Sequence, residues 1–173
     1  SGCWSHARRK FVEAVDELPD QAMEIIRQIR RLYAVEKHAR DEDFRSDQRH
    51  QLRNESDPAI LSEIHQRLES LEPRLLPQSP LGKAVRYALN EWEPLQTFLK
   101  DGRIELDNNL TENAIRPSAI GKRRWLFIGH PAAGWRSAVI YSMTVTCRRL
   151  GIDPAEYLPD VLKRLPGATN HQI

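Results

Sequence analysis

The residues best suited to chemistry lie in the segment DNNLTENAIRP, residues 107–117. Its first three residues offer capping side chains for a helix that begins near Leu110. On that helix Glu112 and Arg116 stand four residues apart and share a polar face with the two asparagines. The capping candidates are Asp107, Asn108 and Asn109. Taken alone, this group is either an ordinary capped helix with an ion pair or a carboxylate presented for catalysis.

A one-sided run of charge follows this segment. Residues 113–152 contain seven cations and no carboxylate: Arg116, Lys122, Arg123, Arg124, Arg136, Arg148 and Arg149. A long stretch of a single sign is the electrostatic footprint expected of a protein that binds phosphate. The alternative is that these cations pair with carboxylates of the preceding helices, since surface ion pairs are common.

The whole composition limits the class of protein. The 173 residues are about one domain's worth, and 26 Lys and Arg against 24 Asp and Glu require no polyanionic partner. Two distant cysteines form no disulfide framework, which favours a reducing cytoplasm. With no apolar run near the roughly 20 residues that span a bilayer, we expect a soluble chain without a membrane partner. Its start at Ser1 suggests a processed or partial chain.

Helical periodicity predicts the elements that would position these residues. An amphipathic helix is expected over 20–40, and a shorter one over 5–18 that ends at Pro19. Residues 41–54 are almost wholly polar, which predicts a solvated helix or a loose connector with the weakest order. Asp57-Pro58 is typical of a helix start, with apolar residues continuing to Leu75.

The second half is predicted to contain helices of different lengths and one short strand. Ser79-Pro80 opens a helix that runs to Asp101-Gly102 with a kink at Pro94. The helix near Leu110 should be short, because Pro117 breaks the hydrogen-bond ladder. Residues 125–128 indicate a short buried strand, 136–150 a helix with apolar or small residues nearly all round and therefore buried, and Asp153-Pro154 the start of a last helix.

Several ordered motifs resemble transposases of the insertion sequence 66 family. Residues 107–117 are similar to that family's DNN..ER.IRP signature, and GCWSHARRKF, residues 2–11, to its GCWAHARRKF. The resemblance continues collinearly to about Pro166. Within the two motifs the matching residues include Cys3, His6, Arg8, Arg9, Asp107, Asn108 and Asn109. Asn113 departs from a usual arginine.

The resemblance implies a bacterial transposase that acts on transposon ends and target DNA in the cytoplasm, at the nucleoid. Its ribonuclease-H-like core would hold an Asp, Asp, Glu triad and two ions of Mg²⁺ or Mn²⁺, with Glu112 as catalytic glutamate and metal ligand. Both aspartates lie upstream of GCWAHARRKF in the family. We therefore expect a fragment that is inactive alone, binds no catalytic metal tightly and needs the upstream part of the transposase as its partner.

The expected organisation is mainly α-helical, with one or two short strands. Residues 1–18 would be a strand and helix remnant of the core, 19–102 a helical insertion, 103–166 the C-terminal core segment with the glutamate, and 167–173 a flexible tail. Apolar patches or strand edges left exposed should drive homodimerisation.

Other readings of the residues stay open. A noncatalytic DNA-binding module derived from a transposase would use the basic stretch, whereas a self-associating helical bundle would use its long helices. Cys3 and His6 form at most half a zinc site, and a buried cysteine is the simpler interpretation. Trp125 and Trp135 would either stack on unpaired bases or belong to the core.

Overall fold

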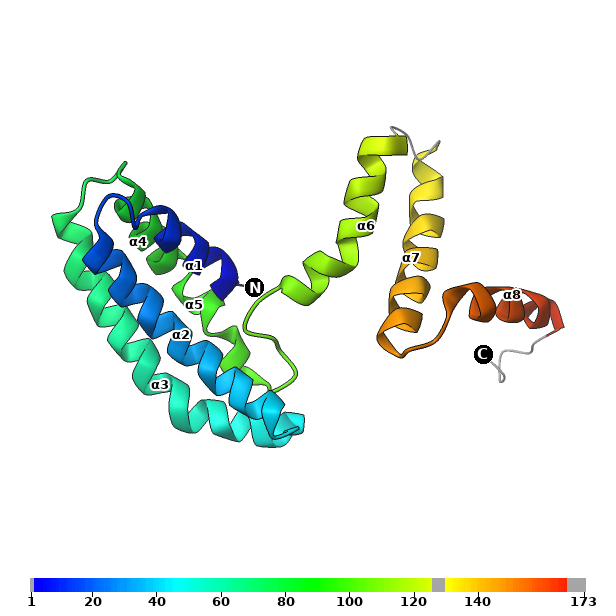
Figure 1. The fold of residues 1–173 in the computed structure, drawn as a ribbon, viewed down its shortest axis with the longest axis horizontal. Coiled ribbons are helices and arrows are strands. Elements are labelled where there is room, and N and C mark those ends of the chain that lie inside the picture. Colours follow the sequence, from blue (N-terminus) through cyan, green and yellow to red (C-terminus); the bar gives the residue numbers. More distant parts are fainter. Residues whose placement is uncertain (1, 126–129, 168–173) are drawn as a thin grey trace. The chain divides into compact units, whose positions relative to one another are not determined.

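The computed structural model describes residues 2–125 and 130–167, and within these residues every regular element is a helix (Figure 1). The chain forms two compact units, residues 1–109 and 110–173. The mainly α-helical fold expected from the sequence is confirmed. No strand occurs in the described residues: Trp125 closes a helix, and the remainder of the expected strand, 126–128, lies outside them.

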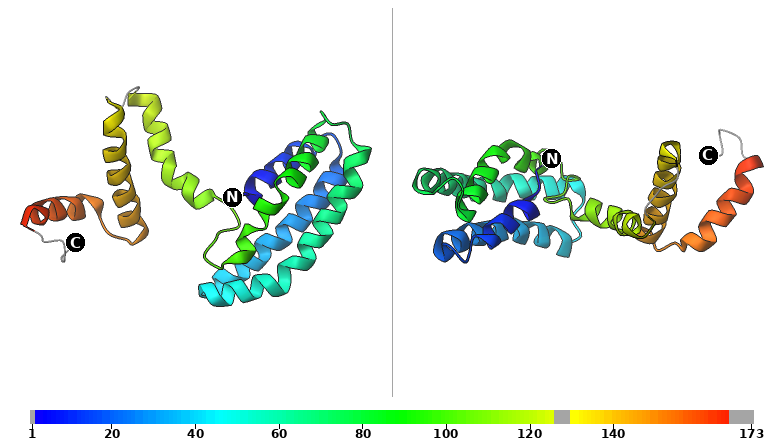
Figure 2. Two further views of the ribbon diagram at one scale, coloured as in Figure 1. Left: turned by 180° about the vertical axis from the view of Figure 1, so that it is seen from behind. Right: turned by 90° about the horizontal axis from the view of Figure 1, so that it is seen from above.

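The first unit is a bundle in which each of four helices packs against two others, in the ring α1–α2–α3–α4 (Figures 1 and 2). Its elements are α1 (Trp4–Glu13), α2 (Pro19–Asp41), α3 (Ser46–Leu71), the 3-10 turn η1 (Glu72–Arg74), α4 (Pro80–Asn90), α5 (Trp92–Leu95) and the 3-10 turn η2 (Thr97–Lys100). The expected helix over 5–18 ends early, at Glu13, because Pro19 begins α2, where its fixed φ suits the first helical turn.

One apolar core joins the four helices. Its largest fully buried members are Trp4, Phe11, Ile25, Ile26, Ile29, Leu32, Ile64, Leu68, Leu81 and Leu95. The α2 residues among them recur at three- and four-residue steps, which places them on one face of a 3.6-residue helix. The Trp4 indole N–H also donates to the Leu95 carbonyl (2.9 Å), so the start of the chain is tied to α5.

The third helix corrects one expectation and decides between two alternatives. Asp57 and Pro58 lie inside α3 rather than at its start, and the polar residues from 46 onward form the first turns of that helix. Pro58 cannot donate a backbone hydrogen bond, so local preference alone would end the helix here. Arg53, fully buried one turn earlier, binds Glu36 of α2 and anchors this part of α3. Tertiary contacts therefore override the local signal.

The expected continuous helix over residues 80–100 is divided into α4, α5 and η2. Its predicted start is correct, since the Ser79 hydroxyl accepts the Gly82 N–H (3.0 Å). Among the glycines of this unit, Gly82 and Gly102 have the two tightest backbone approaches. A Cβ on Gly82 would lie 2.1 Å from the Leu76 carbonyl oxygen, and one on Gly102 would lie 1.8 Å from the Ser46 carbonyl oxygen.

The second unit contains α-helices and short 3-10 turns in its described residues. They are α6 (Asn109–Trp125), the 3-10 turn η3 (Pro131–Ala133), α7 (Gly134–Arg149), α8 (Pro154–Arg164) and the 3-10 turn η4 (Leu165–Gly167). The prediction of a short helix before Pro117 was wrong, because α6 contains this proline in its interior. Pro117 supplies no N–H to the helix, but the Ser118 hydroxyl donates to the Ile115 carbonyl (2.8 Å) at the same turn.

The prediction that α7 is buried was also wrong. Cys147 is its only buried residue among those whose side chains are described, whereas Trp135, Val139 and Ile140 are about half exposed or more. An apolar helix reaches burial only where another element covers it. The expected cap of the last helix is correct, since the Asp153 carboxylate accepts the Ala155 N–H (2.8 Å).

Candidate functional site

The Asp107 carboxylate is the centre of the predicted motif. Its Oδ1 accepts the Asn109 backbone N–H (3.0 Å), and its Oδ2 accepts the Asn109 side-chain amide (2.9 Å) and the Tyr33 hydroxyl (3.0 Å). Asn109 is the first residue of α6. Asp107 thus satisfies a backbone donor at the start of α6 and joins that start to α2 of the first unit.

The structure brings two motifs of the resemblance together in the first unit. The Asn108 N–H donates to the buried Cys3 sulfur (3.4 Å), and the Trp4 N–H donates to the Leu106 carbonyl (3.3 Å). The simpler interpretation of Cys3, a buried cysteine, is therefore the one the structure supports. Residues 2–11 are therefore joined by hydrogen bonds to the segment that precedes α6.

Tyr33 was missed as a site residue, because its place among the apolar positions of α2 gave no sign of a polar role. Burial, followed by the negative charge of Asp107 and the hydrogen bond to it, raises the pKa of the Tyr33 hydroxyl well above its usual value. Tyr33 therefore stays protonated and acts as a donor. Arg8 lies close enough to oppose this pKa shift and is half-buried, whereas Arg9 is exposed.

Glu112 and Arg116 lie on α6, with Glu112 in its first turn. Both side chains are exposed. A carboxylate in the first turn is favoured by the partial positive charge at a helix N-terminus. Among the described residues no carboxylate forms an ion pair with Arg116, so the structure gives no support to the simple i,i+4 pair as the reason for this spacing.

The described cations of the basic stretch are exposed. They are Arg116, Arg136, Arg148 and Arg149, and none of them pairs with a carboxylate in the part of the chain that the structure describes. Arg149 donates to the Leu110 carbonyl (3.0 Å), and the Arg136 guanidinium lies 5.6 Å from the ring centroid of Trp135. Lys122, Arg123 and Arg124 belong to α6 by their backbone, and their side chains lie outside the described part of the structure.

Carboxylates of the long N-terminal helices have partners within the first unit. Glu24 pairs with Arg67, Glu63 pairs with Arg31, and Glu36 pairs with both Arg49 and Arg53. These acids are therefore already engaged.

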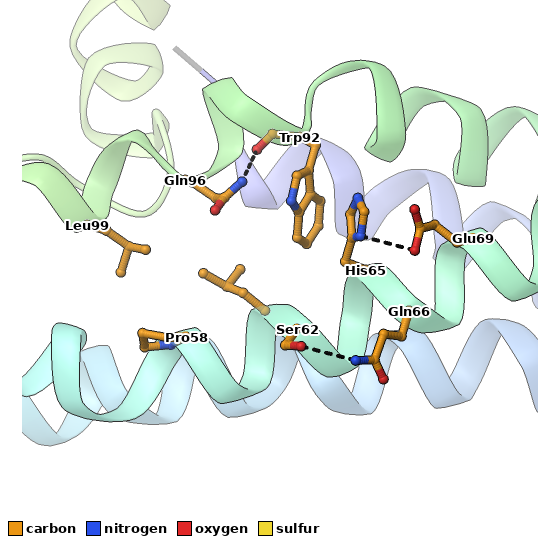
Figure 3. Close-up of a pocket in the computed structure, with 9 residues that line it drawn as sticks. Pro58, Ser62, His65, Gln66, Glu69, Trp92, Gln96 and Leu99 are labelled. Atoms are coloured by element: carbon orange, nitrogen blue, oxygen red, sulfur yellow. Dashed lines mark hydrogen bonds and ion pairs between the residues drawn. The ribbon is translucent and has the colours of Figure 1, made fainter.

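A separate hollow of about 460 Å³ opens between α3 and the α5–η2 segment (Figure 3). Its lining residues are Pro58, Leu61, Ser62, His65, Gln66, Glu69, Trp92, Gln96 and Leu99. The His65 ring lies 4.7 Å from that of Trp92, and the other side of the indole faces the hollow (Figure 3). The lining contains no Lys or Arg, which makes it a poor place for phosphate, and no predicted site residue belongs to it.

The residues present do not fit a two-metal centre. Such a centre needs several carboxylates to hold both ions, and Glu112 contributes one. The described residues contain no group of three or more His, Cys, Asp or Glu side chains placed to bind an ion.

Comparison with known proteins identifies the class. The family model described as Transposase IS66 family matches residues 1–136, and the chain belongs to this family. It is 35% identical over 166 residues to the uncharacterized protein y4qI of Sinorhizobium fredii, an alignment that covers 95% of this chain and 30% of that protein. The uncharacterized protein y4jD of the same organism is 32% identical over 164 residues, covering 94% and 32%.

The chain thus spans about a third of the length of the curated relatives it matches. No solved structure matches it. Among the described residues no helix is long and apolar enough to cross a membrane.

Proposed function

We propose that this chain forms the C-terminal part of the catalytic region of a DDE transposase. In this proposal Glu112 is the third carboxylate of the active site, and the cations that follow it lie along the DNA path. The observation that carries the proposal is the anchored start of α6: Asp107 holds its first residue, Glu112 stands in its first turn, and Arg116 is exposed one turn later.

The remainder of the active site would come from the upstream part of the transposase. The curated relatives are about three times as long as the aligned segment, which leaves room for the two aspartates and for a ribonuclease-H-like sheet. Mg²⁺ or Mn²⁺ suits an all-carboxylate site and would be held by the complete enzyme. We place its action in the bacterial cytoplasm, on nucleoid DNA. Alone, the chain should not cut DNA.

DNA binding by the exposed arginines is tested by salt dependence. Affinity for arbitrary duplex DNA should fall steeply as salt rises, with a log–log slope near −0.9 for each phosphate contacted. Arg136→Gln combined with Arg148→Gln should reduce that slope by about 2. A binding constant indifferent to salt would refute the proposed DNA path.

The role of Glu112 is tested in a full-length transposase carrying this segment. Glu112→Gln should abolish strand cleavage, because the amide cannot replace a charged metal ligand, and should leave DNA affinity unchanged. Glu156→Gln, an exposed acid on α8, serves as the control. Cleavage that survives Glu112→Gln would remove Glu112 from the mechanism.

A second candidate is a noncatalytic self-associating or DNA-binding module. The observation that favours it is the exposure of large apolar residues on α7, namely Trp135, Val139 and Ile140. Exposed apolar patches of this kind mark interaction surfaces. Light scattering across a concentration series would show a mass that rises toward a dimer, and Val139→Ser with Ile140→Ser should return it to a monomer.

A further inference from the structure

The ion pairs of the first unit leave helix α2 with uncompensated positive charge. By sequence α2 is nearly balanced, with five Lys and Arg against four carboxylates. Two of those carboxylates are bound by arginines of α3: Glu24 by Arg67, and the buried Glu36 by Arg49 and Arg53. Of the α2 cations, Arg31 pairs with Glu63 and Lys37 with Asp41, and the other three have no ion pair among the described residues.

Three of the five α2 cations form a row on the outside of the helix, whereas Arg31 and Arg40 lie outside it. Arg27, Arg30 and Lys37, here called the α2 row, are all exposed and follow each other at steps of three and seven residues. At 3.6 residues per turn they fall within an arc of about 80° and extend about 15 Å along the helix. Ala34, small and exposed, lies between them.

Little in the described part of the chain neutralises the α2 row. No described carboxylate forms an ion pair with Arg27 or Arg30, and Lys37 pairs with Asp41, four residues on, at a largely exposed position. An exposed pair of this kind is worth less than about 1 kcal/mol and exchanges readily for another anion. The neighbouring Arg31 is held by Glu63 of α3 and does not belong to the row.

We infer that the α2 row is a second DNA contact, made by the helical bundle to the phosphate backbone and distinct from the arginines of the second unit. Arginine and lysine side chains on one helix face suit contacts to phosphates along a DNA strand, and the short Ala34 lets the helix approach the backbone closely. The inference rests on the proposed function, because it assumes that the chain binds DNA.

The test is the salt dependence of duplex binding by the full chain with two matched double variants. Arg27→Gln with Arg30→Gln should reduce the log–log slope by about 2, close to 0.9 for each phosphate that is no longer bound. The control, Arg45→Gln with Arg103→Gln, removes the same charge from exposed arginines that are paired with Asp47 and Asp101. Its slope should stay at the wild-type value.

The outcomes separate this inference from the proposed function. Equal slopes for the α2 variant and wild type, with a reduced slope for Arg136→Gln and Arg148→Gln, would overturn the α2 contact and keep the DNA path of the second unit. No DNA binding by the wild-type chain would overturn both. If the α2 variant instead weakened self-association at unchanged DNA affinity, the row would serve a protein partner and the inference would be wrong. Helicity measured by circular dichroism should be equal in all variants, because glutamine is a good helix former.

Discussion

Replacing Glu36 by glutamine should destabilise the first unit severely. Glu36 is 1% exposed and its carboxylate accepts three hydrogen bonds: one from Arg53 Nε (2.5 Å), and two from Arg49, from Nε (2.9 Å) and Nη2 (2.5 Å). In Glu36→Gln, Arg49 keeps Glu105, but the fully buried Arg53 is left with neutral acceptors, namely the backbone carbonyls of Phe98 and Asp101 and the amide oxygen of the new glutamine.

The magnitude follows from the burial of Arg53. Removing one partner of a buried ion pair leaves an uncompensated charge and costs about 3–5 kcal/mol. Among the described residues the other buried carboxylate is Asp57, and burial together with the charge of Glu36 raises its pKa to about 7. Glu36→Gln removes that charge and so lowers the pKa of Asp57, and ionisation of Asp57 at neutral pH would offset part of the cost. Measurement at pH 5.5 limits this compensation.

Hydrogen–deuterium exchange measures this effect in the first unit without interference from the second. The most protected amides of α2 and α3 should exchange roughly 100- to several-thousand-fold faster, since each 1.4 kcal/mol is tenfold. Glu63→Gln is the matched control, because it breaks an exposed ion pair. The side chains of Glu63 and its partner Arg31 are each 48% exposed, so the loss in the free energy of unfolding should be less than about 1 kcal/mol. Equal losses of stability in the two variants would refute the reasoning.

Three further predictions concern other parts of the first unit. The pKa of Asp57 is raised to about 7 in the folded chain, against about 3.9 in the unfolded chain. Between these pH values the folded state binds more protons than the unfolded state, so the free energy of unfolding should fall as pH rises from about 4 to 7. Asp57→Asn should abolish this fall in thermal melts. Tyr33→Phe should cost about 1.5–3 kcal/mol, the range for a hydrogen bond to a charged group, and should speed amide exchange at Asn109; unchanged exchange there would show that Asp107 needs no help from α2. Ser79→Ala should lower stability by about 1 kcal/mol in urea denaturation because the α4 cap is removed, and Ser79→Thr should retain most of it.

The sequence predicts helices well where the apolar period and the cap agree. Residues 20–40 were expected as a helix and α2 spans Pro19–Asp41, while the caps at Ser79 and Asp153 are correct. It fails where a distant contact outweighs a local signal. Asp57-Pro58 has the form of a helix start, yet α3 continues through it. Arg53, one turn earlier, is bound by Glu36 of α2, which is distant in sequence, and this contact holds the chain helical.

The candidate site shows the same division. The resemblance singled out Asp107, Asn108 and Glu112 as candidates, because short motifs preserve residue type and spacing. It could not locate Tyr33, whose partner is 74 residues away and whose position fits an apolar helix face equally well. The unpaired arginines of α2 could not be found from the sequence for a similar reason. Net charge counts the charged residues, whereas the ion pairs between α2 and α3 depend on the fold.

The close backbone approaches at Gly82 and Gly102 have a consequence for engineering this protein. Glycine to alanine inside a helix is a standard stabilising change, worth about 0.8–1 kcal/mol. At position 82 of α4 the sign should reverse, because the added methyl carbon would lie 2.1 Å from a carbonyl oxygen that belongs to another segment. Position 102 is still tighter, whereas Gly134 and Gly167 have open space. Consensus or library methods that reward helix propensity would therefore select the wrong residue at position 82, and thermostabilisation is better sought at the open positions.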